Sequence, residues 1–142
     1  MPVRTASAEW QGNLAEGSGE VRSESGALSS SYSFPSRFET GEGTNPEELI
    51  AAAHSACYAM ALSHLLSEAG HTPESVSATA RVRLDQVEGG FAITGIELAC
   101  EARVPGISPE AFQEQAEAAK GGCPVSKALS AVEIDLTARL LS

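Results

Sequence analysis

The residues best suited to chemistry in this chain are two cysteines with different surroundings. Cys57 lies in the middle of the apolar stretch 45–70, where hydrocarbon would shield a thiol from bulk water. Packing alone also explains such a residue, because cysteine is among the side chains most often buried. Cys123 lies between a Gly-Gly pair and a proline, where a helix start would stabilise a thiolate and the glycines would let the thiol move. This setting favours a reactive role for Cys123.

One arginine and one glutamate have the right character to support a reactive thiol. Arg37 carries a permanent charge and lies between Phe34 and Phe38, which would keep water from its guanidinium group; a solvated loop arginine is the alternative. Glu47 and Glu48 suit a helix N-terminus, and the carboxylate of either could also bind the planar guanidinium of Arg37. Ten residues of helix, about 15 Å, separate Glu47 from Cys57, so the two cannot touch within one helix. Glu47 would therefore serve Cys57 through Arg37, through a bend, or from a second chain.

The other candidate residues give weaker evidence for a chemical role. His54 precedes Cys57 by three residues, and together with Cys123 these side chains offer three ligands to a zinc ion. No Cys-x-x-Cys or similar motif supplies the fourth. Cys100 falls on the inward face of a predicted strand, which favours core packing. The chain has no glycine-rich phosphate loop and no Gly-x-Ser-x-Gly motif.

The stretch that must position Cys57 is predicted to be one long helix over 45–70. Asn45 suits the N-cap and is followed by a proline, and Glu48 stands where a capping box places its acid. Gly70 suits the C-terminal stop. Apolar residues cover most of the helix circumference, so we expect this helix to be enclosed, and a packed dimer would enclose it.

The remaining patterns predict an α+β fold, in which short strands, helices and a strand hairpin follow one another. The expected elements are short antiparallel strands within 3–38, a turn-rich loop at 33–43, hairpin strands at 74–87 and 91–104, a helix at 108–122, a short helix after Pro124, and a closing strand at 131–141.

Composition and charge narrow the class of protein. The length of 142 residues fits a single domain over 1–142. A net charge of −10 argues against nucleic acid or an anionic membrane as a partner. The sequence contains no uninterrupted run of about 18 apolar residues, so we expect no membrane span. No apolar segment lies near the start, so we expect no signal peptide. Three cysteines without an export signal predict free thiols in a cytoplasmic protein.

Five motifs can be compared with a known pattern. They are Ser36-Arg37-Phe38-Glu39, the run from Gly43 to Cys57, Gly89 to Thr94, Val104 to Ile107, and Ala119 to Ser126. Together they resemble the OsmC/Ohr family of osmotically inducible and organic hydroperoxide resistance proteins, and its OsmC branch most closely. The resemblance spans nearly the whole chain. It implies an OsmC-like α+β fold with antiparallel β-sheets packed around a long central helix, in an intertwined homodimer with active sites at the subunit interface.

The resemblance also implies a peroxidase that works with cysteine alone, without metal, haem or flavin. By position, Cys57 matches the peroxidatic cysteine, Cys123 the resolving cysteine, Arg37 the activating arginine and Glu47 its partner. The implied reaction reduces organic hydroperoxides, and hydrogen peroxide more weakly, through a Cys57 sulfenic acid and a Cys57–Cys123 disulfide. A lipoyl-type dithiol, a thioredoxin-type protein or a small thiol would restore the cysteines, and the activity would protect against oxidative stress.

The apolar residues Phe34, Phe38, Met60 and Leu62 are expected to surround this site and to favour an alkyl hydroperoxide. Two alternatives stay open on the residues alone. One is a non-catalytic binding or structural module of the same fold. The other is a zinc site made by His54, Cys57 and Cys123.

Overall fold

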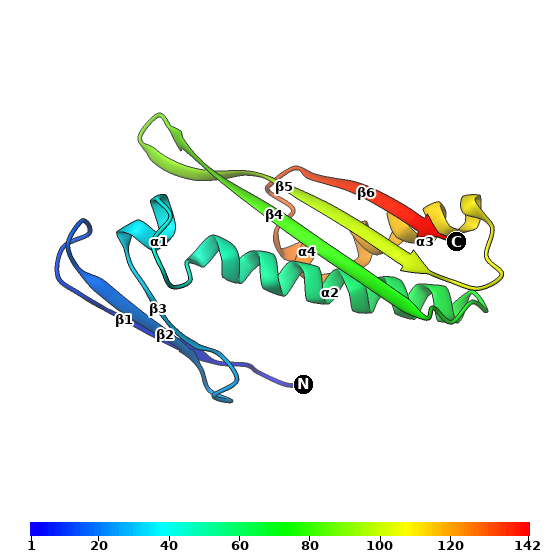
Figure 1. Ribbon diagram of the computed structural model, residues 1–142, viewed down its shortest axis with the longest axis horizontal. Helices are drawn as coiled ribbons and strands as arrows, with labels where there is room; N and C mark the ends of the chain where they lie inside the picture. The colour runs from blue at the N-terminus through cyan, green and yellow to red at the C-terminus, as the bar shows by residue number, and fades with distance from the viewer. The chain divides into compact units, whose positions relative to one another are not determined.

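The structure is a computed structural model that describes residues 1–142. The chain forms two compact units, Met1–Leu49 and Ile50–Ser142. Two three-stranded sheets and one long helix confirm the predicted α+β class (Figure 1).

The first unit contains an antiparallel sheet and a short helix. Strands β1 (Ala6–Gln11), β2 (Ser18–Ser23) and β3 (Ser29–Tyr32) pair in chain order, which confirms the predicted short strands. Helix α1 (Phe34–Phe38) then occupies part of the predicted loop. Its N-cap, Ser33, exchanges side-chain and backbone hydrogen bonds with the third helical residue in a capping box. One helical turn is too short to leave a periodic sequence pattern, so Ser33 as N-cap and Pro35 are the signals in the sequence that indicate it.

Helix α2 (Pro46–Glu68) is the predicted long helix, and its ends follow the predicted chemistry. Asn45 Oδ1 accepts a hydrogen bond of 2.7 Å from the backbone N–H of Glu48. At the other end Gly70 adopts φ +92°, a left-handed conformation that glycine tolerates best. The N–H of the residue after it bonds to the carbonyl of Leu66, as in a Schellman motif.

The sheet of the second unit combines an antiparallel and a parallel pair. Strands β4 (Ser75–Val87) and β5 (Gly90–Arg103) form the predicted hairpin. Strand β6 (Ile134–Leu141) pairs with β5 in parallel, so the prediction of purely antiparallel sheets is wrong for this pair. Helices α3 (Pro109–Gly122) and α4 (Pro124–Ala128) stand between these strands in the chain. They carry the chain back to the end of the sheet at which β5 begins, as a parallel pair requires.

The core of the second unit forms where α2, β5 and α3 meet (Figure 1). Its buried side chains come from successive turns of the two helices and alternate positions of the strand: Tyr58, Leu62, Leu66, Leu98, Cys100, Ala102, Val104, Phe112, Ala116 and Ala119. The Tyr58 hydroxyl donates to the carbonyl of Ala116 at 3.0 Å. Cys100 is buried in this core, as predicted, and its burial raises the pKa of its thiol.

The other side of α2 is exposed, so the prediction of an enclosed helix is wrong for the single chain. Met60 is 74% exposed, and Ala52, Ala53 and Ala56 are also exposed. By length and composition α2 passes a test for membrane-spanning helices, with a mean hydropathy of 1.4, as the core helices of soluble proteins also do. The absence of a membrane partner therefore stays a prediction.

Candidate active site

Cys57 and Cys123 meet in the second unit although 66 residues separate them in the chain. Their Sγ atoms lie 2.8 Å apart and share a hydrogen bond, and both residues are free thiols. This distance exceeds the disulfide bond length of about 2.0 Å, but only a small displacement separates the two states. Cys57 is partly exposed, whereas Cys123 is fully buried. A reagent from solvent can therefore reach Cys57, while Cys123 faces its neighbour.

The surroundings of Cys123 differ from the mobile loop that the sequence predicts. Gly121 and Gly122 are the last residues of α3, and Cys123 joins α3 to α4. The backbone N–H of Cys123 bonds to the carbonyl of Ala119 at 3.0 Å. The thiol is thus held between two helices, and the prediction of a hinged loop is wrong.

The two thiols differ in how well their surroundings stabilise a negative charge. Burial raises the pKa of Cys57, and its hydrogen bond with Cys123 raises it further, against an opposing contribution from the Val125 N–H. Burial also raises the pKa of Cys123. Hydrogen bonding from Cys57, from the N–H and hydroxyl of Ser126 and from the Val125 N–H outweighs this, and the pKa falls below its ordinary value. In the chain by itself, the first negative charge of the pair therefore favours Cys123.

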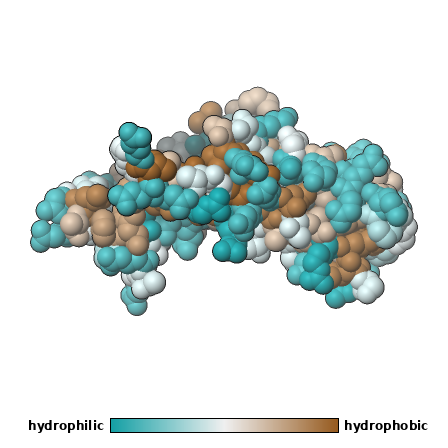
Figure 2. Space-filling model, turned by 90° about the horizontal axis from the view of Figure 1, so that it is seen from above, coloured by the Kyte–Doolittle hydropathy of each residue, from teal (hydrophilic) through white to brown (hydrophobic).

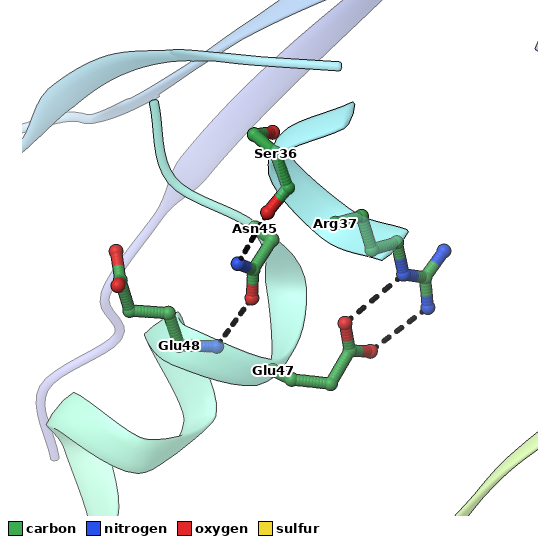
Figure 3. Close-up of polar contacts among 5 residues, drawn as sticks. All are labelled: Ser36, Arg37, Asn45, Glu47 and Glu48. Atoms are coloured by element: carbon green, nitrogen blue, oxygen red, sulfur yellow. Dashed lines mark hydrogen bonds and ion pairs between the residues drawn. The ribbon is translucent and has the colours of Figure 1, made fainter. Parts of the chain in front are cut away.

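Arg37 and Glu47 form a bidentate ion pair in the first unit (Figure 3). The Nε and Nη2 atoms of Arg37 donate to the two carboxylate oxygens of Glu47 at 3.0 and 2.8 Å. The Glu47 side chain is almost buried, whereas that of Arg37 is 35% exposed. The hydrogen bonds to Glu47 raise the pKa of Arg37 and outweigh desolvation. The guanidinium is fixed, charged and partly open, and its Nη1 takes no part in the pair.

A set of polar contacts fixes α1 against the first turn of α2 and so sets the position of Arg37 (Figure 3). Asn45 Nδ2 donates to the carbonyl of Ser36 at 2.9 Å, and the Ser36 hydroxyl donates to the carbonyl of Thr44 at 2.7 Å. The Thr44 hydroxyl donates to the Glu48 carboxylate, which therefore does not close the predicted capping box. The motif residues around Arg37 thus hold α1, and with it Arg37, in position against the start of α2.

A second bridge, between His54 and Ser126, lies beside the cysteine pair. His54 Nε2 is 2.7 Å from Ser126 Oγ, and both side chains are buried. The sequence singles out His54 only as a zinc ligand and does not single out Ser126. No group of three or more His, Cys, Asp or Glu side chains in residues 1–142 is arranged to hold a metal ion, which removes the geometric basis of the zinc alternative. The signal that points to this bridge is spacing: His54 precedes Cys57 by three residues, and Ser126 follows Cys123 by three.

The apolar residues predicted to surround the site do not behave alike. Leu62 is fully buried in the core, so its predicted place at the site is wrong. Phe34 and Phe38 stack at 4.8 Å between ring centroids, and the Arg37 guanidinium lies 5.3 Å from the Phe38 ring centroid. Met60 is exposed on α2, three residues beyond Cys57. Contact of Phe34, Phe38 and Met60 with an apolar substrate stays a prediction.

The OsmC-like protein family matches this chain over residues 39–137, a range that holds Glu47, Cys57 and Cys123. The chain belongs to the OsmC family. Peroxiredoxin OsmC of Escherichia coli strain K12 is 53% identical to it over 136 residues, which cover 95% of this chain and 94% of that protein. The organic hydroperoxide resistance protein OhrB of Bacillus subtilis is 33% identical over 130 residues, covering 90% and 91%.

Solved structures place the same fold over the full length of this OsmC-family chain. The crystal structure of OhrB of Bacillus subtilis matches with a TM-score of 0.70 and 30% identity, covering 96% of this chain and 98% of that one. The organic hydroperoxide resistance protein OsmC of Legionella pneumophila matches with a TM-score of 0.72 and 26% identity over 100% of both chains. The predicted OsmC-like fold is confirmed.

Proposed function

We propose that this chain is a cysteine-based, thiol-dependent peroxidase that reduces organic hydroperoxides to alcohols and so protects against oxidative stress. The observation that carries the proposal is the pair of free thiols 2.8 Å apart, with Cys57 partly exposed and Cys123 buried. The likeness to a peroxiredoxin OsmC and to organic hydroperoxide resistance proteins supports the reaction and substrate class.

The proposed reaction uses the two sulfurs in turn. The Cys57 thiolate attacks the terminal oxygen of R–O–O–H, the O–O bond breaks, and the alkoxide leaves as the alcohol after taking a proton. Cys57 becomes a sulfenic acid. Cys123 attacks the Cys57 sulfur, the S–O bond breaks, and the hydroxyl leaves as water. A lipoyl-type dithiol, a thioredoxin-type protein or a small thiol supplies two electrons and two protons to restore both thiols.

Arg37 is the residue we propose to activate Cys57. The contacts within the chain favour charge on Cys123, so a cation brought close to Cys57 would favour the thiolate on the sulfur that meets peroxide. Arg37 is a fixed, partly exposed cation with Nη1 outside its bond to Glu47. The same charge would stabilise the negative oxygen as the O–O bond breaks.

The Arg37→Gln variant should lower the rate of peroxide attack about 100-fold, because one preorganised cationic donor is lost from the transition state. Stopped-flow measurement of Cys57 oxidation gives this rate. Arg22→Gln is the matched control, since Arg22 is an exposed arginine of β2 with only a 4.0 Å contact to Glu20. Equal rates for Arg37→Gln and the unmodified protein would remove Arg37 from the mechanism.

We also propose that the protein is a homodimer in which a second copy covers the exposed side of α2. The face drawn in Figure 2 shows apolar atoms open to solvent between polar ones. On the exposed side of α2, Met60 is 74% exposed, while Ala52, Ala53 and Ala56 leave room for a close approach of a second chain. An open hollow of about 510 Å³, lined by Met60, Ser63 and other residues of α2 and β4, belongs to the same side.

The Met60→Glu variant should be monomeric at micromolar concentration, because a desolvated charge opposes burial of the α2 face. Light scattering would then give the chain mass of 14.7 kDa, while the unmodified protein gives twice this value. Met60→Leu keeps an apolar side chain of similar volume and should remain dimeric. A 14.7 kDa mass for the unmodified protein would refute the dimer.

Domain organisation, partners and location follow from the same proposal. We propose that residues 1–142 act as one OsmC-like domain, in line with solved relatives that match the chain from end to end. We propose a cytoplasmic protein, and the net charge of −10 supports the absence of a nucleic acid or anionic membrane partner. The proposed chemistry requires no cofactor beyond the reductant.

The substrate preference gives the direct assay of this function. With a dithiol reductant in excess, kcat/KM should be at least about tenfold higher for cumene hydroperoxide than for hydrogen peroxide, because Phe34, Phe38 and Met60 offer apolar contact to an aryl or alkyl group. Similar values for the two peroxides would reject the preference. No turnover with either would reject the peroxidase and favour a non-catalytic module.

A further inference from the structure

The two segments that carry the cysteines are joined twice, with matched spacing. Cys57 of α2 meets Cys123 at the start of α4, and His54 of α2 meets Ser126 of α4. His54 stands one helical turn before Cys57, and Ser126 three residues after Cys123. The His54–Ser126 hydrogen bond and the Cys57–Cys123 contact therefore lie next to each other and join the same two segments. Because the His54–Ser126 bond is 2.7 Å long and both partners are buried, it fixes how far Cys123 stands from Cys57.

The direction of the hydrogen bonds follows from the other nitrogen of His54. Nδ1 is buried and has no hydrogen-bond partner. A neutral imidazole carries one N–H, and placing it on Nδ1 would bury a donor without an acceptor, which folded proteins rarely do. The N–H therefore belongs on Nε2, which donates to Ser126 Oγ. Burial lowers the pKa of His54 and keeps the ring neutral.

This assignment leaves the hydroxyl proton of Ser126 free to point elsewhere. Ser126 stands three residues after Cys123, the N-cap of the same short helix, and its hydroxyl is one of the groups that lower the pKa of Cys123. The order is then His54 Nε2–H to Ser126 Oγ, and Ser126 O–H to Cys123 Sγ. A donor aimed at the sulfur stabilises its anion and costs no rearrangement when the anion forms.

We infer that His54 and Ser126 are positioning residues for the second chemical step, which hold Cys123 at attack distance from Cys57 and direct a hydroxyl donor to the Cys123 sulfur. In that step the Cys123 sulfur forms a bond to the Cys57 sulfur and the S–O bond of the sulfenic acid breaks. The leaving hydroxide takes the proton that Cys123 gives up and departs as water. His54 keeps its proton throughout, so the pair acts through Cys123 and is not itself oxidised or reduced.

The inference rests on the proposed peroxidase, and a single-turnover experiment keeps the two separable. Reduced protein is mixed with cumene hydroperoxide without reductant, and quenched samples are analysed by mass for sulfenic acid and for the disulfide. The first phase reports peroxide attack on Cys57, and the second reports disulfide formation. Absence of the first phase in the unmodified protein would defeat the proposed function, whereas the inference concerns only the second phase.

Ser126→Ala should slow disulfide formation at least about tenfold, because the variant loses both the hydroxyl donor to Cys123 and the hydrogen bond to His54. The rate of peroxide attack should change less than about twofold. The sulfenic acid should then accumulate and pass to sulfinic acid in excess peroxide. Ser126→Thr keeps the hydroxyl and should recover the rate of disulfide formation. His54→Gln keeps an N–H donor near the Nε2 position and should lose less than His54→Leu.

A matched control distinguishes positioning from general loss of stability. Tyr58→Phe removes another buried hydrogen bond of α2, to Ala116, that does not involve the cysteine pair. It should lower the melting temperature by an amount similar to that of Ser126→Ala while leaving both phases unchanged. Disulfide formation in Ser126→Ala at the unmodified rate, or equal slowing in Tyr58→Phe, would overturn the inference.

Discussion

Replacing Cys57 with serine should lower steady-state peroxide turnover by at least about a thousandfold, because a hydroxyl at this site is neither ionised nor a useful nucleophile toward peroxide. Cys57 is partly exposed and lies on a helix held by other contacts, so unfolding free energy should change by less than about 1 kcal/mol. A coupled assay with a dithiol reductant measures the turnover, and thermal melting measures the stability.

The control for this substitution is the third cysteine. Cys100→Ala removes a thiol that is buried in the core and takes no part in the hydrogen bond between Cys57 and Cys123. It should keep peroxidase activity even where the small cavity lowers stability by about 1 kcal/mol. Full activity in Cys57→Ser, or loss of activity in Cys100→Ala with an intact fold, would show that the roles of the cysteines have been assigned wrongly.

Replacing Cys123 with serine has a different expected result, since it leaves the first step in place. This variant should consume about one equivalent of peroxide per chain and then stall with a dithiol reductant, because no neighbouring thiol condenses with the sulfenic acid. Further peroxide should convert Cys57 to sulfinic acid. Mass spectrometry of the peptide that contains Cys57 distinguishes one added oxygen from two.

Ser126→Ala is the variant to compare with Cys123→Ser, because it is expected to slow disulfide formation without abolishing it. Cys123→Ser should show no disulfide at any time, while Ser126→Ala should form one late. Undiminished cycling of Cys123→Ser would mean that the reductant attacks the Cys57 sulfenic acid directly and that Cys123 has no part in turnover.

Features of the fold that depend on neighbouring residues in the chain were open to prediction from the sequence. The caps of α2 at Asn45 and Gly70 follow from local hydrogen bonding, and the β4–β5 hairpin follows from alternation around Gly89 and Gly90. Helix α1 was missed because one turn has no periodicity. The parallel pairing of β6 was missed because alternation describes which residues of a strand face inward and is silent on its direction.

The candidate site likewise has residues that the sequence singles out and contacts that only tertiary packing creates. The spacing of the motif residues and the resemblance to a family single out Cys57, Cys123, Arg37 and Glu47, and the structure brings these together as two pairs. The link between His54 and Ser126 spans 72 residues and depends on how α4 packs on α2, which no local pattern encodes. The exposure of Met60 likewise depends on tertiary packing, because composition makes α2 apolar on every side.

The central claim is that Cys57 and Cys123 form one redox unit, and one anaerobic titration tests it most directly. One equivalent of cumene hydroperoxide is added to the reduced protein, the free thiols are counted, and any disulfide is mapped by non-reducing peptide mass. Two of the three thiols should disappear within seconds, and the peptides of Cys57 and Cys123 should be joined. Three unreacted thiols, or a disulfide that includes Cys100, would contradict it.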